Sequence, residues 1–355
     1  MSVSASKLFI LEPYPGLEKV LRSSGIARAA ADGVGNDGPC SDRKIVRNLT
    51  REDRMKYVDA SFAARSHRRP TLGIMSGAFH HITVPTDGSA TAERGIDIAL
   101  DLIAAEGTIT FCSVVESAAV LMSTREITAF DPGPAGQTQE REALAFCERA
   151  RTQAIERGVK ADVRVLHGQR IEAIDALVRQ NGSDAIVIGT HGRTGVARGF
   201  LGSVAEGLLR RSDVPVISVH EHDDMQTGPI VVAIDDSRSS VAAVDAAIGI
   251  ANARDTSLVL IHVFGGHLDD DRTTRLLRTV TDQARRRGVR STSTLRAGTP
   301  SEEIVAVADE VVGSMIAIGT HGRGPVARLV HGSVAAAVVE HAHVPVVTIR
   351  RPGER

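Results

Sequence analysis

The stretch Gly189-Thr190-His191-Gly192, followed after nine intervening residues by Gly202-Ser203, decides how this chain is expected to fold. The same pattern occurs a second time, as Gly319-Thr320-His321-Gly322 followed at the same spacing by Gly332-Ser333. An apolar run precedes each copy, and a helical pattern ending in Val-Pro-Val follows it, at residues 214–216 and 344–346. The order predicts a strand, a glycine loop, a helix and a further strand, the arrangement in which α/β proteins hold phosphate groups.

Each copy closes a longer repeat. An apolar run from Ile82 to Pro85 leads to Asp87, and the apolar residues 96, 99, 100 and 103 then recur at helical spacing, as in a buried strand followed by an amphipathic helix. The same order starts again at Ile230 to Asp235, at an offset of 235 − 87 = 148 residues. Strands that alternate with helices predict an α/β, Rossmann-like fold, with two tandem open parallel five-stranded sheets flanked by helices.

The two halves differ by one insertion. The offset of 148 residues at Asp87 falls to 288 − 158 = 130 residues at Gly158 and stays at that value through both glycine loops. We therefore place an insertion of 18 residues between Val115 and Gly158 of the first half. Its sequence Asp131-Pro132-Gly133-Pro134 predicts an irregular loop or flap, ahead of a helix from roughly residue 139 to 157.

The resulting domain organisation has four parts. Residues 1–76 form an N-terminal extension that we expect to be poorly ordered, residues 77–221 the first domain, residues 222–228 a linker and residues 229–351 the second domain. The extension contains Gly33-Val34-Gly35-Asn36-Asp37-Gly38, but no strand precedes this motif, so a dinucleotide site is not expected there. Met55 and Met75 leave open the hypothesis that translation starts downstream.

The composition excludes several classes of function. The 42 basic and 43 acidic residues give a net charge of −1, which offers no broad attraction to nucleic acid or to an anionic membrane. The chain has no tryptophan, and no apolar run approaches the roughly 18 residues of a membrane span. Cys40, Cys112 and Cys147 are too scattered for a disulfide framework or a zinc site, and Cys112 is expected to be buried in a strand. We expect a cytoplasmic protein.

The repeated motifs suit a phosphorylated ligand. Glycines let the backbone turn tightly and approach a ligand, while the N–H groups at the start of the next helix and the hydroxyl of Ser203 or Ser333 can donate to phosphate oxygens. Asp87 and Asp235 are expected at the carboxyl edge of the sheet, where a carboxylate can bind a ribose or base, or help to hold Mg²⁺ beside phosphates. Alternatively, each aspartate only favours the start of the following helix.

On these residues both halves resemble domains of the universal stress protein family, in its ATP-binding branch with the signature G-x-x-G, nine residues, G-[S/T]. The resemblance covers about residues 80–220 and 229–350. It implies an adenine nucleotide alpha hydrolase-like fold, ATP as the ligand, with or without Mg²⁺, and a nucleotide-responsive regulator in stress or energy adaptation. It also implies that the last strands, residues 214–219 and 344–349, pair across an internal pseudo-twofold, and it leaves open whether whole chains dimerise.

The resemblance further implies one nucleotide site in each half. We expect the first site to include Pro85 and the motif residues that follow it. We expect the second site to bind more weakly, because Ala233 replaces this proline and Asp236 replaces Gly88, which adds negative charge near a polyphosphate. For His191, His321, Arg193 and Arg323 the alternative is a solvent-facing loop residue. The first site comprises Pro85, Thr86, Asp87, Val115, Gly189, His191, Gly192, Arg193, Gly202, Ser203 and Val204. The second comprises Ala233, Ile234, Asp235, Val263, Gly319, His321, Gly322, Arg323, Gly332, Ser333 and Val334.

No conventional catalytic motif accompanies these sites. The sequence has no G-x-x-x-x-G-K-[ST] loop, no G-x-S-x-G nucleophile elbow and no H-E-x-x-H helix, and we assign no catalytic residue and no metal ligand. The expected sites would hold ATP rather than turn it over quickly. Two alternatives stay open: a slow ATPase or adenylyl-transferring enzyme centred on Asp87 and Mg²⁺, and a scaffold with vestigial nucleotide sites.

Overall fold

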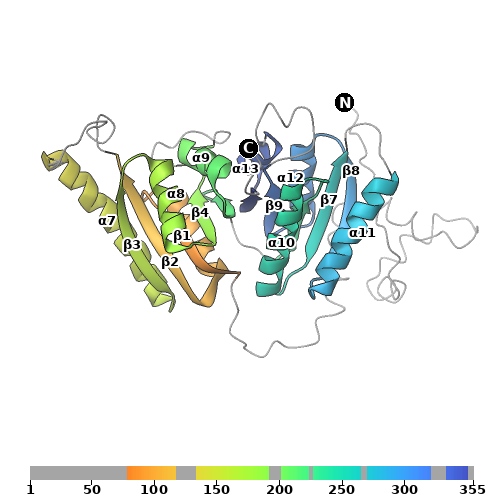
Figure 1. The fold of residues 1–355 in the computed structure, drawn as a ribbon, viewed down its shortest axis with the longest axis horizontal. Coiled ribbons are helices and arrows are strands. Elements are labelled where there is room, and N and C mark those ends of the chain that lie inside the picture. The colour runs from red at the N-terminus through yellow and green to blue at the C-terminus, as the bar shows by residue number, and fades with distance from the viewer. Residues whose placement is uncertain are drawn as a thin grey trace, which may run out of the picture. The chain divides into compact units, whose positions relative to one another are not determined.

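The computed structural model of the chain describes residues 78–116, 133–191, 201–223, 227–264, 270–320 and 333–350. The predicted N-terminal extension, residues 1–76, and its glycine motif lie outside these ranges. Figure 1 shows how the described elements are arranged.

Both halves contain the expected alternation of strands and helices. The first half comprises β1 (Phe79–Pro85), α5 (Ala90–Leu102), β2 (Ile103–Val115), α7 (Gly133–Glu156), β3 (Lys160–His167), α8 (Arg170–Asn181), β4 (Ala185–Gly189), α9 (Ser203–Arg211) and β5 (Val216–Val219). The second half comprises β6 (Ile230–Ala233), α10 (Arg238–Ala253), β7 (Leu258–Phe264), α11 (Asp270–Arg286), β8 (Ser291–Ala297), α12 (Pro300–Glu310), β9 (Met315–Gly319), α13 (Ser333–His341) and β10 (Val346–Ile349).

The strands form one sheet in the order β3-β2-β1-β4-β5-β10-β9-β6-β7-β8. Within each half all neighbouring strands are parallel, which confirms the predicted α/β fold. The halves join through an antiparallel pairing of β5 with β10, in which Ile217 lies opposite Val347. These two residues are equivalent in the repeat, since 217 + 130 = 347, so the pairing has the self-complementary form of a twofold interface. The predicted pairing of the last strands is confirmed.

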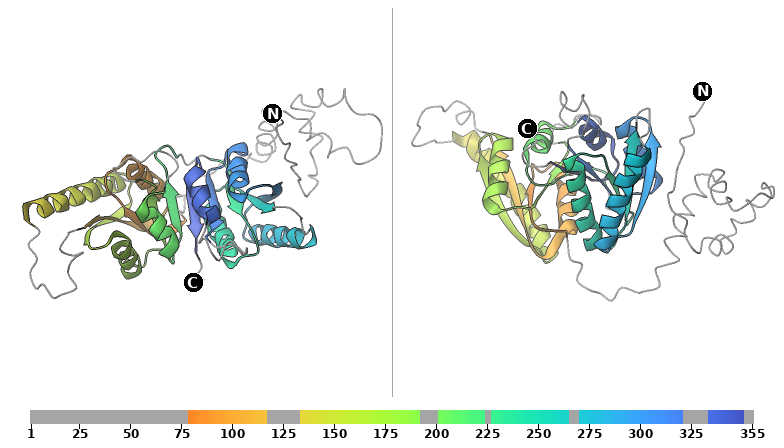
Figure 2. Two further views of the ribbon diagram at one scale, coloured as in Figure 1. Left: turned by 90° about the horizontal axis from the view of Figure 1, so that it is seen from above. Right: turned by 45° about the vertical axis from the view of Figure 1, so that its right-hand side comes forward.

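Helices cover both faces of the sheet (Figure 2), and the buried side chains form a separate hydrophobic core on each face. Alternate residues of a strand point to opposite faces. In β4, Val187 packs in the core that contains Ile96 of α5, and the neighbouring Ile186 packs in the core that contains Leu208 of α9. The first helix of each half therefore lies on one face of the sheet, and the helix after the glycine loop lies on the other.

The structure corrects the description of the insertion in two respects. Helix α7 already begins at Gly133, seven residues before the position equivalent to the start of α11 (270 − 130 = 140; 140 − 133 = 7), so part of the predicted irregular stretch is helical. Pro134 is tolerated because N–H groups in the first turn have no acceptor within the helix. The remainder, residues 117–132, lies outside the described residues.

The second correction concerns register. Val115 pairs with His167, whereas in the second half Phe264 pairs with Ala297, the equivalent of His167 (167 + 130 = 297). Val115 therefore corresponds to Phe264, not to Val263, and the insertion has 149 − 130 = 19 residues instead of 18. A single residue inserted between the first helix and the second strand of the second half accounts for the shift.

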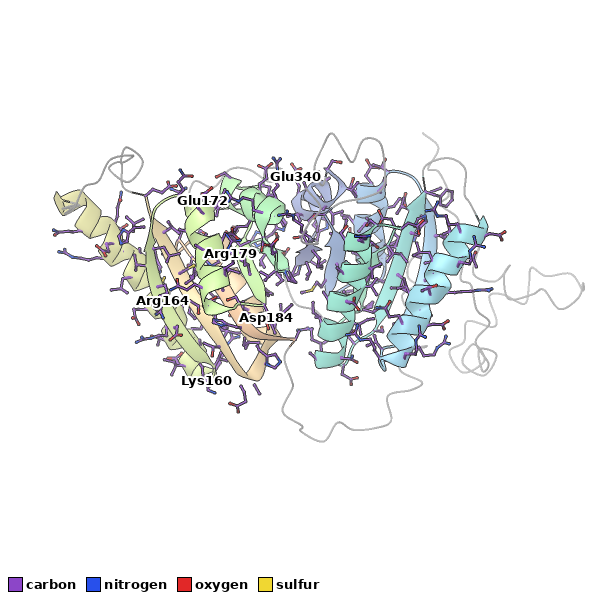
Figure 3. All side chains as sticks on the ribbon, in the orientation of Figure 1. Lys160, Arg164, Glu172, Arg179, Asp184 and Glu340 are labelled. Carbon is purple, nitrogen blue, oxygen red and sulfur yellow. The ribbon has the colours of Figure 1, made fainter. Side chains whose placement is uncertain are left out.

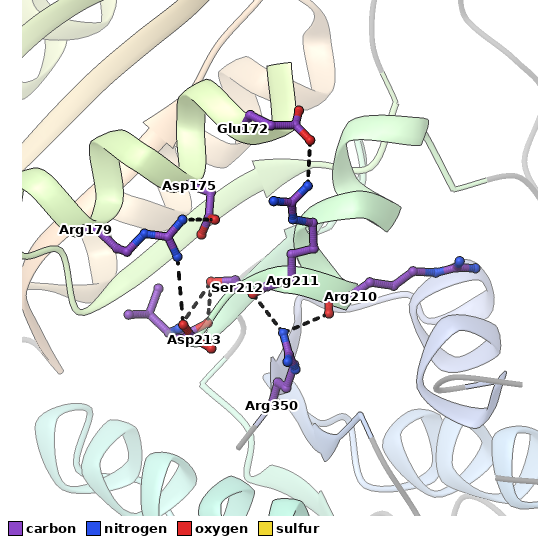
Figure 4. Close-up of polar contacts among 9 residues, drawn as sticks. Glu172, Asp175, Arg179, Arg210, Arg211, Ser212, Asp213 and Arg350 are labelled. Atoms are coloured by element: carbon purple, nitrogen blue, oxygen red, sulfur yellow. Dashed lines mark hydrogen bonds and ion pairs between the residues drawn. The ribbon is translucent and has the colours of Figure 1, made fainter. Parts of the chain in front are cut away.

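Arg350 adds a polar contact beside the junction of β5 and β10. It follows β10 and donates from Nη1 to the carbonyl oxygens of Arg210 and Arg211, at 3.0 and 2.9 Å, at the C-terminal end of α9 (Figure 4). A cation at the negative end of a helix is favourable, and it satisfies carbonyl groups that have no partner within the helix. Arg211 also pairs with Glu172 of α8 at 2.6 Å.

We predict that Ile217→Ala lowers the free energy of unfolding by about 2–5 kcal/mol, because Ile217 is fully buried at the centre of the joint sheet. Val241→Ala is the control, since Val241 is 45% exposed and its truncation should cost no more than about 0.5 kcal/mol. Urea unfolding followed by circular dichroism measures both. Equal losses in the two variants would contradict the central position of the β5–β10 pair.

Candidate functional site

The site of interest lies at the carboxyl edge of the parallel strands in the first half. In the order β3-β2-β1-β4-β5, β1 and β4 are neighbours, and the chain continues from β1 to β2 on one side and from β4 to β5 on the other. Such a switch point leaves a crevice outside the strand ends, where open α/β sheets bind ligands. Asp87 follows β1 and His191 follows β4, so the structure brings both motifs to this switch point.

Hydrogen bonds connect the loops after β1 and β4. The Thr91 hydroxyl donates to the carbonyl oxygen of His191, and the Ser89 hydroxyl lies 3.4 Å from the same oxygen. The Ser89 hydroxyl also accepts from the N–H of Ala92, which confirms Ser89 as the N-cap of α5. Ser237 caps α10 in the same way. In the first helix of each half, one N–H group of the first turn therefore has a side-chain partner within the chain.

Gly189 and Gly319 are required by packing between a strand and a helix. A Cβ on Gly189 would lie 2.7 Å from the Oγ1 and 2.8 Å from the carbonyl carbon of Thr91, in the first turn of α5. A Cβ on Gly319 would lie 2.7 Å from the carbonyl carbon of Ser239, the residue equivalent to Thr91 (91 + 148 = 239). The end of the fourth strand thus touches the backbone of the first helix in both halves. Among the described residues, this packing contact requires glycine at both positions, independently of any ligand.

Asp87 and Asp235 both stabilise the loop that leads into the first helix. Oδ1 of Asp87 accepts from the N–H of Ser89 at 3.0 Å, and Oδ1 of Asp235 accepts from the N–H of Ser237 at 2.9 Å. These contacts are those expected of residues that favour a helix start. Both side chains are only partly buried, so their carboxylates are also accessible at the sheet edge. The two roles that the sequence left open are thus compatible.

The two strand ends differ at the residue after the aspartate. Gly88 has φ = +74°, and a Cβ there would lie 2.5 Å from the ring of Phe146, so the first half needs glycine at this position. Asp236 at the equivalent position forms an ion pair with Arg272 of α11. The extra negative charge predicted for the second site therefore has a cation beside it, which removes part of the reason to expect weaker phosphate binding there.

Helices α8 and α9 begin without a side-chain cap. Gln169 and Gly202 are their N-cap residues, and neither cap makes a side-chain hydrogen bond to the helix. The first N–H groups of a helix have no partner within it and carry its positive end, so they suit an anion. Gly202 itself is tightly placed: its N–H donates to the carbonyl oxygen of Thr190 at 2.8 Å, and a Cβ would approach that oxygen equally closely.

A pocket of about 270 Å³ lies where these two helices start. Two predicted site residues, Ser203 and Val204, line it, whereas Asp87 and Gly189 do not. Glu116, which directly follows Val115, and Arg170, the first residue of α8, also line the pocket and were not predicted from the sequence. The sequence does contain a difference between the two halves that points to Arg170, because the second half has Pro300 at the equivalent position (170 + 130 = 300). The described lining residues are Glu116, Gln169, Arg170, Ile171, Glu172, Ser203 and Val204.

His191 is held inside the first half. Its Nδ1 lies 3.0 Å from the Thr190 hydroxyl, and its ring centroid lies 6.1 Å from that of His220. Its Nε2 is buried and has no hydrogen-bond partner among the described residues. The side chain is partly buried, and a contact of His191 with a ligand stays a prediction.

Several predicted site residues cannot be placed. Gly192, Arg193, His321, Gly322, Arg323 and Gly332 lie outside the described residues. In the second half, Ala233 ends β6 and is followed by Ile234 and Asp235, Gly319 ends the neighbouring strand β9, and Ser333 and Val334 begin α13. Val263 lies in β7, one residue before the end of the strand.

Other chemistry finds little support in the described part of the chain. No group of three or more His, Cys, Asp or Glu side chains there could hold a metal ion. Cys112 is fully buried as expected, and burial raises the pKa of the Cys147 thiol to about 12 and that of Cys112 further, so neither thiol supplies a thiolate near neutral pH. No helix in the described ranges has the length and apolar character needed to cross a membrane.

Comparison with known proteins identifies the family. The model of the Universal stress protein family matches residues 78–220 and 227–350, so the chain belongs to this family and contains two tandem copies of its domain. Universal stress protein Rv2005c of Mycobacterium tuberculosis is 29% identical over 188 residues, which cover 48% of this chain and 63% of the relative. Universal stress protein Rv1996 of the same organism is 27% identical over 237 residues, covering 59% and 74%. The chain thus spans less than two thirds of the length of the first of these relatives.

Solved structures support the fold. A universal stress protein from Archaeoglobus fulgidus DSM 4304 superposes with a TM-score of 0.61 at 22% identity, covering 80% of this chain and 100% of that one. A protein described as a putative universal stress protein from Pseudomonas aeruginosa UCBPP-PA14 gives a TM-score of 0.52 at 14% identity, with coverage of 77% and 94%. At these identities the comparison concerns the fold alone.

We predict that Gly189→Ala destabilises the protein by about 1–3 kcal/mol in the absence of any ligand, because its Cβ would overlap the first turn of α5. Gly249→Ala is the matched control. Gly249 lies within α10 with no atom within 4 Å of an added Cβ, so alanine there should stabilise by about 0.4–1 kcal/mol. Chemical denaturation of both variants gives the comparison. A neutral Gly189→Ala variant would show that the strand and helix do not pack as closely as described.

Proposed function

We propose that the chain binds ATP or a related adenine nucleotide at the carboxyl edge of the first half, and that occupancy of this site is the signal it provides in stress or energy adaptation. The observation that carries the proposal is the pocket between the uncapped starts of α8 and α9. The phosphate chain would contact the N–H groups at the start of α9 and the exposed hydroxyl of Ser203. The nucleoside would lie toward the switch point, near Asp87.

The fit of a nucleotide can be judged from the chemistry of these residues. In α5 and α10 one N–H group of the first turn donates to the hydroxyl of Ser89 or Ser237, whereas α8 and α9 have no such side-chain cap. The phosphate of a ligand is the kind of partner that uncapped N–H groups accept. A pocket of about 270 Å³ is close to the lower end of the range of roughly 300–1,000 Å³ found for small-molecule sites. It would accommodate part of a nucleotide, with the remainder extending along the sheet edge.

The proposal assigns binding rather than rapid turnover to the site. The described residues of the pocket offer no cluster of ligands for a metal ion, and neither buried thiol is reactive near neutral pH. We propose the same kind of ligand for the second half, where Asp235 and Ser333 occupy the equivalent positions. Weaker binding is expected there, because Pro300 replaces Arg170 and removes one N–H donor at the start of α12.

We predict that the wild-type chain binds ATP with a measurable stoichiometry in native mass spectrometry, and that ATP raises its unfolding temperature as expected for a ligand of the folded state. Ser203→Ala should weaken ATP binding by roughly tenfold, because a hydrogen bond to a charged group is lost. Thr279→Ala is the control, since Thr279 is an exposed residue of α11 whose hydroxyl donates to the carbonyl of Arg275. Calorimetric titration measures the affinities.

Three results would change this account. Absence of any adenine-nucleotide binding by the wild-type chain would favour a scaffold with vestigial sites. Steady release of phosphate that Asp87→Ala abolishes would favour an enzyme. Equal ATP affinities of Ser203→Ala and wild type would remove the start of α9 from the site.

A further inference from the structure

The pocket of the first half contains an ion pair that the second half lacks. Nη2 of Arg170 lies 2.7 Å from Oε2 of Glu116, which joins the first residue of α8 to the residue after β2. Both residues line the pocket, and their side chains are 50% and 33% exposed. In the second half the residue equivalent to Arg170 is Pro300, and Gly265 follows Phe264 where Glu116 follows Val115. Both charges of the pair are therefore particular to the first half.

Arg170 occupies a position where a cation is electrostatically unfavourable. The first turn of a helix carries its positive end, so an arginine there needs an anion nearby. Glu172, the acidic residue in the first turn of α8, pairs with Arg211 at 2.6 Å. Glu116 is accordingly the carboxylate that faces the Arg170 guanidinium across the pocket, at the place where a phosphate would meet the starts of α8 and α9.

Close helix packing fixes the shape of this pocket. A Cβ on Gly207 of α9 would overlap Cδ1 of Ile171, so the backbone of α9 packs directly on this side chain of the first turn of α8. This contact holds the two helix starts next to each other, with Arg170 on one and Ser203 on the other. In the second half the equivalent residues are Ser301 and Ala337, so a smaller side chain replaces that of Ile171 and a larger one replaces that of Gly207.

We propose that Arg170 is a phosphate-binding residue of the first pocket, and that a ligand phosphate displaces Glu116 from it. The guanidinium has five donors in a planar fork that fits a phosphate as well as it fits a carboxylate. An exposed ion pair contributes little to stability, so exchanging the carboxylate for a more highly charged phosphate chain is favourable. The pocket thereby selects ligands with a di- or triphosphate chain over an uncharged nucleoside. This inference rests on the proposed nucleotide site and adds the residue that recognises the charge of the ligand's phosphate chain.

The test compares charge variants with matched ligands. Calorimetric titrations of the full chain use ATP, adenosine and inorganic pyrophosphate as probes. Arg170→Gln should weaken ATP and pyrophosphate binding by roughly 10- to 100-fold and leave adenosine unchanged. Glu116→Gln should strengthen ATP and pyrophosphate binding severalfold, because the competing carboxylate is lost. Arg164→Gln is the control for net charge: Arg164 is an exposed residue of β3, labelled in Figure 3, that donates to the carbonyl of Val163 and does not line the pocket.

The outcomes separate this inference from the proposed function. Wild-type binding of ATP that Arg170→Gln does not alter would overturn the inference and leave the nucleotide site intact. Weaker ATP binding by Glu116→Gln would overturn the exchange of partners, and an equal loss for adenosine and ATP in Arg170→Gln would show that Arg170 acts only on the structure. Binding of pyrophosphate that depends on Arg170, without any binding of ATP or adenosine, would support the inference and refute the adenine-nucleotide proposal.

Discussion

The contact between the end of the fourth strand and the first turn of the first helix is the constraint on which both halves depend. Gly189 touches the backbone of Thr91, and Gly319 touches that of Ser239, so no side chain larger than hydrogen fits at either position. Because the strand and the helix approach so closely, the carbonyl oxygen of His191 comes within reach of the Thr91 and Ser89 hydroxyls. These hydrogen bonds connect the loops after β1 and β4 and fix one side of the crevice at the switch point.

The helices on the two faces of the sheet begin differently at this edge. On one face, α5 is capped within the chain by Ser89, whose hydroxyl accepts from the N–H of Ala92. On the other face, α8 and α9 begin at Gln169 and Gly202 without side-chain caps, and the contact between Ile171 and Gly207 holds their starts together. The described lining of the pocket at these helix starts includes Glu116, which follows β2, and Arg170 of α8, but not Asp87.

Much of the fold could be predicted from the sequence, because the two halves repeat the same order of apolar runs, glycines and helical patterns. The pairing of the last strands was also predictable, although only through resemblance to a family. The register was not: the shift that aligns Val115 with Phe264 depends on one residue between a helix and a strand, which no motif marks. The helical start of the insertion at Gly133 was hidden by Pro134, which normally ends helices but is harmless in a first turn.

The candidate site was predictable in part for the same physical reason. Motif glycines, aspartates and serines have short-range roles that spacing reveals, and Asp87, Gly189 and Ser203 all lie at the predicted edge. Arg170 and Glu116 come from different elements and meet only through tertiary packing, so no local pattern could pair them. Amide hydrogen exchange with and without ATP tests the central claim most directly. We predict slower exchange at residues 86–89 and 203–205 when ATP is present, whereas unchanged exchange at both segments would contradict a nucleotide site at this edge.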